Sequence, residues 1–197
     1  MLKVTCKVSN DVLIPFNYKY MINSCLYSLL EKENMELFDL YHNNKKMIKG
    51  KPLKPFVFSN LKMPDKQIFN NIGYLICNDF YFYLNSSNKL VYKIFKEKLN
   101  KVTIGNTIFD TKIVEEEDKV NKDIYISLSP VVIGIKENGF QKYLSPIEPN
   151  YIDKLKENLK RKYFYVFNEE LNTDFQIDIL TYDKEGTLEY YKNHYIK

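Results

Sequence analysis

The sequence predicts an α+β protein of 197 residues, built from two successive units that each combine strands with helices. Three observations support this. Apolar residues repeat at helical spacing in several separate segments, segments of alternating polarity lie between them, and an acidic run near the middle divides the chain. Hydrophobic residues make up 45% and charged residues 27%, which is ordinary for a globular protein.

The first unit opens with an expected strand at residues 2–8, followed by a helix over residues 18–31. The helix is predicted because its apolar residues repeat at helical spacing and form one stripe, namely Tyr18, Ile22, Cys25, Leu26, Leu29 and Leu30. Asn34 then suits the cap of a second, short helix that runs to about residue 42.

Two strands are expected next, at residues 55–61 and 72–84, the latter as a hairpin turning at Asn78-Asp79. A second long helix follows, and residues 106–115 alternate again as a strand. The helix is marked by Leu90, Val91, Ile94, Phe95 and Leu99. The order strand, helix, two strands, helix, strand is the split βαβ arrangement called ferredoxin-like.

The acidic run 115–118 and the following Asn121-Lys122 indicate a linker, so we expect an N-terminal domain at 1–118 and a C-terminal domain at 123–197. In the second domain the expected order is a strand, a helix, and two more strands. The strands lie at 124–128, 175–179 and 187–196, and the helix is marked by Ile152, Leu155 and Leu159. A ferredoxin-like unit would need a further helix and strand. The predicted fold is therefore two tandem ferredoxin-like domains, the second incomplete at its C-terminus.

Charge is distributed unevenly along the chain. Residues 1–114 hold 17 basic and 9 acidic residues, whereas residues 115–197 hold 12 basic and 16 acidic ones. Residues 42–66 contain seven lysines and one acid. A polyanionic partner such as RNA or DNA is one interpretation, and a solvated lysine loop is the other. Arg161 is the one arginine of the chain, so almost all of its basic residues are lysines. Such a preference for lysine is also typical of AT-rich genomes.

Several classes of function are disfavoured by missing motifs. The sequence has no P-loop, no GxGxxG, no GxSxG and no HExxH, so we expect no cofactor and no metal. Its two histidines are His42 and His194, and its three cysteines lie far apart. An odd number of isolated cysteines suits a reducing cytoplasm. No apolar run approaches the ~18 residues of a membrane span.

The candidate catalytic residues are Tyr27, His42 and Lys54. The angular position of Tyr27 on the first helix, about 140° from the centre of the apolar stripe, predicts that it lies away from the core. His42 ends the second short helix, and Lys54 opens the segment Lys-Pro-Phe-Val-Phe-Ser. A base, an acid and a cation suffice for attack of a ribose 2′-OH on its own phosphate without a metal. Each residue also has an ordinary structural explanation, since Tyr27 is one of 17 tyrosines and His42 lies four residues from Phe38.

The sequence resembles the CRISPR repeat-processing endoribonucleases of the RAMP (repeat-associated mysterious protein) superfamily, the sixth Cas protein family. The likeness lies in the order and spacing of five segments. They are Leu13-Ile14-Pro15-Phe16-Asn17-Tyr18-Lys19-Tyr20 leading to Leu26-Tyr27, then Leu40-Tyr41-His42, Lys54-Pro55-Phe56-Val57-Phe58-Ser59, Ile126-Ser127-Leu128-Ser129-Pro130 and Tyr191-Lys192-Asn193-His194-Tyr195-Ile196-Lys197.

The resemblance implies metal-independent cleavage of CRISPR repeat RNA, which gives a 2′,3′-cyclic phosphate and a 5′-hydroxyl in crRNA processing. It assigns Tyr27 and His42 to proton transfer, without deciding which is base and which acid, and Lys54 to phosphate stabilisation. It also implies that four lysines contact the RNA backbone, namely Lys45, Lys46, Lys49 and Lys51. The implied partners are crRNA and a CRISPR effector complex, in the cytoplasm and away from membranes.

The sequence departs from the family in one respect, because the glycine-rich loop and final strand of the second domain are not seen before residue 197. The sheet edge and apolar surface that this would expose predict either self-association, for example as a homodimer, or reduced solubility. The alternative function is a non-catalytic RNA-binding RAMP protein or a degenerate nuclease, in which His42 would be dispensable. A protein-binding module is a third alternative, in which the lysines of residues 42–66 would be dispensable.

Overall fold

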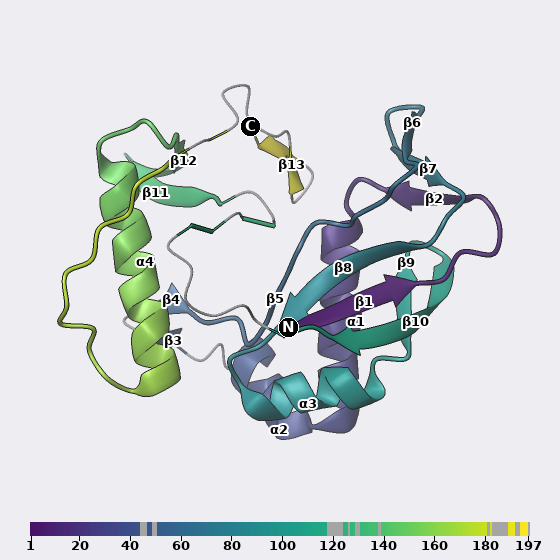
Figure 1. Ribbon diagram of the computed structural model, residues 1–197, viewed down its shortest axis with the longest axis horizontal. Coiled ribbons are helices and arrows are strands. Elements are labelled where there is room, and N and C mark those ends of the chain that lie inside the picture. The colour runs from purple at the N-terminus through teal and green to yellow at the C-terminus, as the bar shows by residue number, and fades with distance from the viewer. Residues whose placement is uncertain are drawn as a thin grey trace.

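The computed structural model describes residues 1–43, 47–48, 51–117, 124–125, 127–128, 131–137, 139–180, 182, 189–191 and 194–196 (Figure 1). Its first half contains β1 (Leu2–Cys6), β2 (Val12–Pro15), α1 (Tyr18–Glu33), α2 (Met35–Phe38), a π-helical turn (Asp39–Asn43), β3 (Met47–Ile48), β4 (Lys51–Pro52), β5 (Val57–Phe58), β6 (Gln67–Phe69), β7 (Gly73–Ile76), β8 (Phe80–Asn85), α3 (Lys89–Lys98), β9 (Lys101–Ile104) and β10 (Thr107–Glu115). The second half contains β11 (Ile133–Glu137), β12 (Phe140–Leu144), α4 (Asn150–Phe167), β13 (Glu189–Tyr191) and β14 (His194–Ile196). Among the helices so described, none has the length and apolarity needed to cross a membrane.

The first half is built on a five-stranded antiparallel sheet with the order β5-β8-β1-β10-β9. Without β9, which forms a hairpin with β10, the remaining strands and the helices α1 and α3 follow the βαββαβ order of a ferredoxin-like unit. The predicted α+β class and ferredoxin-like order are therefore confirmed in this half. The sheet lies in front of α1 in Figure 1.

The register of β1 against β8 places the core on one face of the sheet. Leu2, Val4 and Cys6 lie opposite Leu84, Phe82 and Phe80 respectively, and all six side chains are fully buried. Since side chains alternate across a strand, the residues between them face the other side of the sheet and are partly exposed.

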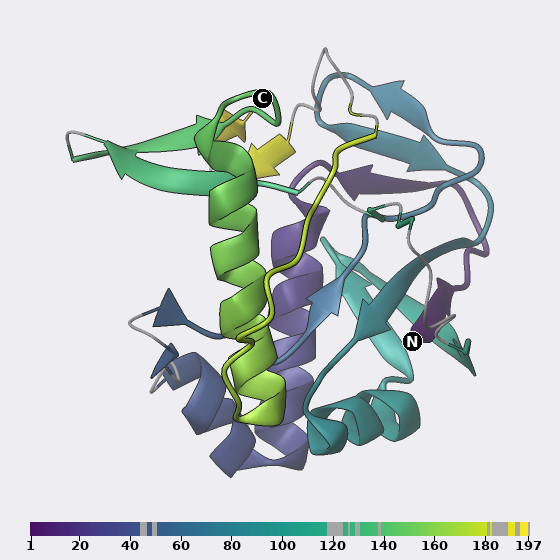
Figure 2. The same cartoon turned by 60° about the vertical axis from the view of Figure 1, so that its left-hand side comes forward.

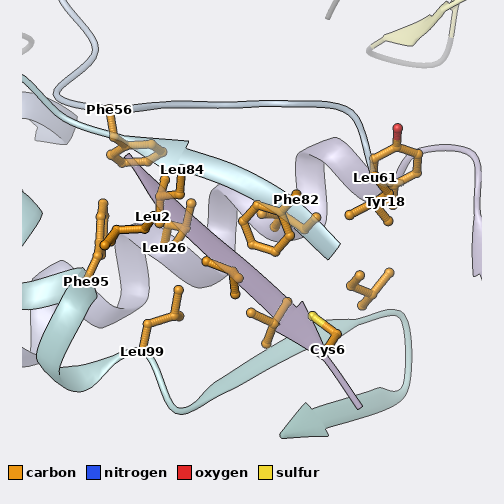
Figure 3. Packing of buried hydrophobic residues seen from close by; sticks show 14 of the residues in the cluster. Leu2, Cys6, Tyr18, Leu26, Phe56, Leu61, Phe82, Leu84, Phe95 and Leu99 are labelled. Carbon is orange, nitrogen blue, oxygen red and sulfur yellow. The ribbon is translucent and has the colours of Figure 1, made fainter. Parts of the chain in front are cut away.

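Helices α1 and α3 cover that buried face. Ile22, Leu26 and Leu30 of α1 are fully buried, as is Phe95 of α3. Figure 3 shows Leu26 and Phe95 pointing into the same space as Leu2, Phe82 and Leu84 of the sheet. The predicted stripe of α1 and the predicted second long helix are thus confirmed, although Leu90 of α3 is 47% exposed. Asn88 caps α3 by accepting hydrogen bonds from the Leu90 and Val91 amides.

The predicted hairpin turning at Asn78-Asp79 is wrong. Strand β7 pairs with β2 and β6 in a separate three-stranded sheet, whereas β8 pairs with β1 and β5. The segment that connects β7 to β8 is held by side-chain hydrogen bonds and not by pairing of these two strands. The Asp79 carboxylate accepts hydrogen bonds from the Val8 amide at 2.8 Å and from the Lys7 ammonium at 2.6 Å, and this pairing lowers the pKa of Asp79.

Other strand predictions in the first half are partly right. The expected strand at 55–61 forms ladder pairs only at Val57–Phe58, with an isolated bridge at Lys62. Strands β2, β6 and β9 were not predicted, because each is short. Strand β10 confirms the expected strand at 106–115.

The second half contains a smaller apolar cluster, formed by Ile133 of β11, Leu144 of β12 and Tyr151 of α4. The predicted helix around residues 152–159 is confirmed and extends over Asn150–Phe167. The expected strand at 175–179 is wrong, since these residues form no ladder. Residues 124–125 and 127–128 also form no strand, and residues 126, 129 and 130 lie outside the described residues.

The remaining predictions for the second half concern residues near its ends. The expected strand at 187–196 is replaced by two short paired strands, β13 and β14. The hairpin of β11 and β12 was not predicted. Residues 118–123 of the predicted linker lie outside the described residues, while β10 continues through Glu115.

Gly73 begins β7 where the backbone of β2 approaches closely. A Cβ atom at this position would lie 2.4 Å from the Ile14 carbonyl oxygen, which is fixed in the ladder with Tyr74. We therefore expect Gly73→Ala to lower the free energy of unfolding by about 1–3 kcal/mol, the usual effect of overpacking. Urea denaturation followed by circular dichroism measures it.

Gly105 offers the matched control, because its surroundings are open although its φ is +62°. Asparagine tolerates this left-handed conformation, so Gly105→Asn should leave the unfolding midpoint nearly unchanged. Equal stability of the wild type and Gly73→Ala would show that β2 and β7 are not packed in this register.

Candidate active site

Tyr27 and His42, two residues singled out by the sequence, lie side by side in the structure. The Tyr27 ring on α1 and the His42 ring on the π-helical turn have centroids 4.9 Å apart and meet edge to face at 60°. His42 is exposed, whereas Tyr27 is only 8% exposed. The pair therefore presents an imidazole to solvent above a buried phenol.

The turn that carries His42 follows from the local sequence. Asn34 ends α1 and begins α2, where its side-chain oxygen accepts a hydrogen bond from the Leu37 amide at 2.9 Å. The chain then continues directly into the π-helical turn. Phe38 is buried at this junction, and its ring stacks under His42 with centroids 4.7 Å apart and planes inclined by 16°. The predicted cap at Asn34 is thus confirmed.

Hydrogen bonds on the turn favour one tautomer of the neutral imidazole. Asn43 donates from its amide nitrogen to the Asp39 carboxylate at 2.6 Å, so its amide oxygen faces His42. That oxygen lies 3.1 Å from His42 Nδ1. Because an amide oxygen can only accept, Nδ1 carries a proton, and the second ring nitrogen, Nε2, holds the lone pair when the ring is neutral.

The expectation that Tyr27 lies on the non-core face of its helix is wrong. Its ring packs against Phe38 at 6.4 Å and Phe56 at 5.1 Å, and Phe56 in turn packs against Phe95. These segments cover the side of α1 that the apolar stripe left open. Burial raises the pKa of Tyr27, so its phenol keeps its proton at neutral pH. Tyr20 of the same helix is 74% exposed.

Lys54 lies on the same segment as Phe56, whose ring packs against Tyr27. Phe56 is 3% exposed and anchors this segment in the core, while Lys54, two residues earlier, is exposed. Lysines Lys45, Lys46 and Lys49 lie outside the described residues, and Lys51 is described only as part of the backbone of β4. Tyr27, Phe38, His42 and Phe56 together are called the aromatic cluster below.

A second group of polar side chains joins the His42 turn to α4. The hydroxyl oxygens of Tyr41 and Tyr165 lie 2.5 Å apart, and the Asn88 side-chain amide donates to Tyr41 at 3.1 Å. Burial, together with the hydrogen bond to Tyr41, raises the pKa of Tyr165. We call these three residues the phenol clamp. Sequence reasoning missed it, because the two tyrosines are 124 positions apart.

The phenol clamp also reaches the Lys54 segment. Asn88 donates from its backbone to the Ser86 hydroxyl at 3.1 Å, and that hydroxyl donates to the Pro55 carbonyl at 2.6 Å. The residues beside His42 and beside Lys54 are therefore connected through the N-terminus of α3. Within the described part of the chain, no three His, Cys, Asp or Glu side chains gather as metal ligands.

Comparison with known proteins agrees with this fold. Residues 113–197 match the family model for the C-terminal part of the CRISPR-associated protein Cas6. A curated relative from Methanocaldococcus jannaschii, named CRISPR-associated endoribonuclease Cas6 1, is 27% identical over 191 residues, which span 92% of this chain and 72% of the relative. The Pyrococcus furiosus protein named CRISPR-associated endoribonuclease Cas6 is 19% identical and is covered over 64% of its length.

Solved structures show the same fold. A structure titled "CRISPR associated protein Cas6" superposes with a TM-score of 0.69 at 23% identity, covering 99% of this chain and 82% of the other. One titled "An RAMP protein binding different RNA substrates" gives a TM-score of 0.77 at 20% identity, with 100% and 84% covered. In residues 113–197 the chain thus matches the C-terminal Cas6 family model, over most of its length it is similar in sequence to curated Cas6 endoribonucleases, and its fold is that of the solved Cas6 and RAMP structures.

Proposed function

We propose that this protein is a metal-independent endoribonuclease that cleaves CRISPR repeat RNA by attack of a ribose 2′-OH on the adjacent phosphate. The observation that carries this proposal is the contact between the Tyr27 and His42 rings, with the imidazole exposed. The names of the curated relatives, which are endoribonucleases, support the same class of reaction.

The protonation pattern of the two rings suggests their roles. His42 Nε2, with its lone pair available, accepts the proton of the 2′-OH as the new bond from the 2′ oxygen to phosphorus forms. The bond from phosphorus to the 5′ oxygen then breaks, and the protonated Tyr27 phenol supplies the proton that this leaving oxygen needs. Lys54 stabilises the extra negative charge on the phosphorane. The products are a 2′,3′-cyclic phosphate and a 5′-hydroxyl.

The wider organisation is part of the proposal. We divide the chain into a domain of residues 1–118, which carries the site, and a domain of residues 123–197. The two separate apolar clusters, one within residues 2–109 and one within residues 133–151, support this division. Lys45, Lys46, Lys49 and Lys51 are proposed as contacts to the RNA backbone, which fix its position without reading its bases.

Cleavage of end-labelled CRISPR repeat RNA from the same genome, in EDTA, tests the proposal. The wild type should cut once and leave a cyclic phosphate, and His42→Ala should slow the cut by about 10²–10⁴-fold, because general acid–base catalysis has this size. RNA bound without a cut by either protein would contradict catalysis and favour the non-catalytic RNA-binding alternative.

The same assay separates Lys54 from the other lysines of its segment. Lys54→Ala should slow cleavage by about 10²-fold, the effect of removing one charge-stabilising donor. Lys62→Ala is the matched control, since Lys62 is also exposed and belongs to the same basic segment. Equal rates for the two variants would rule out a special role for Lys54.

The phenol clamp predicts a positioning role for Tyr165. Tyr165→Phe removes one hydroxyl and leaves Tyr41, beside His42, held by Asn88 alone. A lost hydrogen bond of about 1 kcal/mol at this point should slow single-turnover cleavage several-fold without changing the RNA dissociation constant. The control is Tyr163→Phe, because the Tyr163 ring packs on Phe167 of its own helix. A loss of RNA affinity with an unchanged cleavage rate would contradict the positioning role.

A further inference from the structure

Arg161, the one arginine among 29 basic residues, lies outside the site described above. It belongs to α4 and lines a groove of about 350 Å³ between α4 and β11. The polar residues of the groove are Lys154, Glu157, Asn158, Lys160 and Arg161, and Gly134 of β11 lies on its other side.

Two buried polar atoms at this groove lack hydrogen-bond partners among the described residues. They are Arg161 Nε, a donor, and Asn158 Oδ1, an acceptor. The two residues are three positions apart on the helix and so share one face. Since burying an unpaired polar atom is costly, such a pair at the wall of a groove indicates a bound polar group.

The charge of the groove favours an anion. The groove is lined by three cationic side chains, those of Lys154, Lys160 and Arg161, and by one carboxylate, that of Glu157. Glu157 already accepts two hydrogen bonds from Lys154, at 2.9 and 3.0 Å. A guanidinium presents a planar fork of donors that matches the oxygens of a phosphate, which an ammonium cannot do. An arginine at this position, in a chain that otherwise uses lysine, therefore points to a phosphate.

The groove is connected to the candidate active site by one helix. Arg161 lies four residues before Tyr165, about 6 Å along the axis of α4 and on the same face. Tyr165 contacts Tyr41, the residue next to His42. Helix α4 is thus held against the His42 turn at its C-terminal end and lines the groove in its middle. Figure 2 shows the course of α4, in green, with its C-terminal end near the helices that follow α1.

We propose that this groove binds a backbone phosphate of the RNA substrate through the Arg161 guanidinium, with Asn158 hydrogen-bonded to the same nucleotide. The identity of the substrate as RNA rests on the proposed function. The groove would hold the strand beyond the scissile phosphate, on the surface of α4, and so contribute to affinity and not to the chemical step.

The dissociation constant of fluorescein-labelled CRISPR repeat RNA, measured by anisotropy over a series of salt concentrations, tests this site. All variants are made together with His42→Ala, which prevents cleavage during the titration. Arg161→Gln should weaken binding by about 10-fold, as expected for a charge-assisted hydrogen bond, and lower the slope of log Kd against log salt by about 0.7. Arg161→Lys should weaken binding several-fold and keep the slope, because it retains the charge without the fork.

Lys162→Gln is the matched control, because it removes the same charge from the adjacent exposed position of α4, outside the groove. Thermal unfolding confirms that each variant is folded. Equal affinity and slope for Arg161→Gln and Lys162→Gln would overturn the groove site and leave the nuclease proposal intact. RNA binding that depends on Arg161, in a chain that does not cleave RNA with His42 present, would support the groove and overturn the nuclease. No RNA binding by any variant would overturn the groove site.

Discussion

The packing of aromatic rings around Tyr27 is the constraint on which the rest of the site depends. Tyr27 comes from α1, Phe38 and His42 from the turn after α2, and Phe56 from the segment before β5. None of these segments is joined to another by a β ladder at the cluster, so ring contacts define their relative positions. Phe56 links the cluster to Phe95 of α3 and thereby to the main core, which Figure 3 shows between the sheet and the helices.

The same packing gives the two candidate catalytic groups different environments. Tyr27 is buried and its pKa is raised, which favours a protonated phenol. His42 is exposed, stacked on Phe38 and held by Asn43, which Asp39 orients in turn. The buried phenol of Tyr27 and the exposed imidazole of His42 thus lie on rings that are in contact but have different surroundings. The phenol clamp connects this turn to α4 through the contact between Tyr41 and Tyr165. Tyr165 also packs against the core of the first half.

Sequence patterns were sufficient for elements whose stability is local. The stripe of α1, the helix α3 and the cap at Asn34 depend on neighbours three or four residues away, and the structure has them. Alternation in residues 72–84 correctly indicated strands but could not show that β7 and β8 pair with different partners. The angular position of Tyr27 on α1 was sound, but the elements that bury it come from other parts of the chain. The contact between Tyr41 and Tyr165, and the groove beside Arg161, depend on tertiary packing that no local spacing encodes.

In the proposed mechanism, Tyr27 and His42 act on the RNA as one unit. A double-mutant cycle of single-turnover cleavage rates, with Tyr27→Phe, His42→Ala and both together, tests it most directly. Tyr27→Phe keeps the ring that supports His42 and removes only the hydroxyl. We expect a large loss of rate for each single variant and a double variant little slower than His42→Ala alone, because the effects of groups that act together are strongly non-additive. Losses that multiply as for independent residues, or a Tyr27→Phe variant with the wild-type rate, would contradict it.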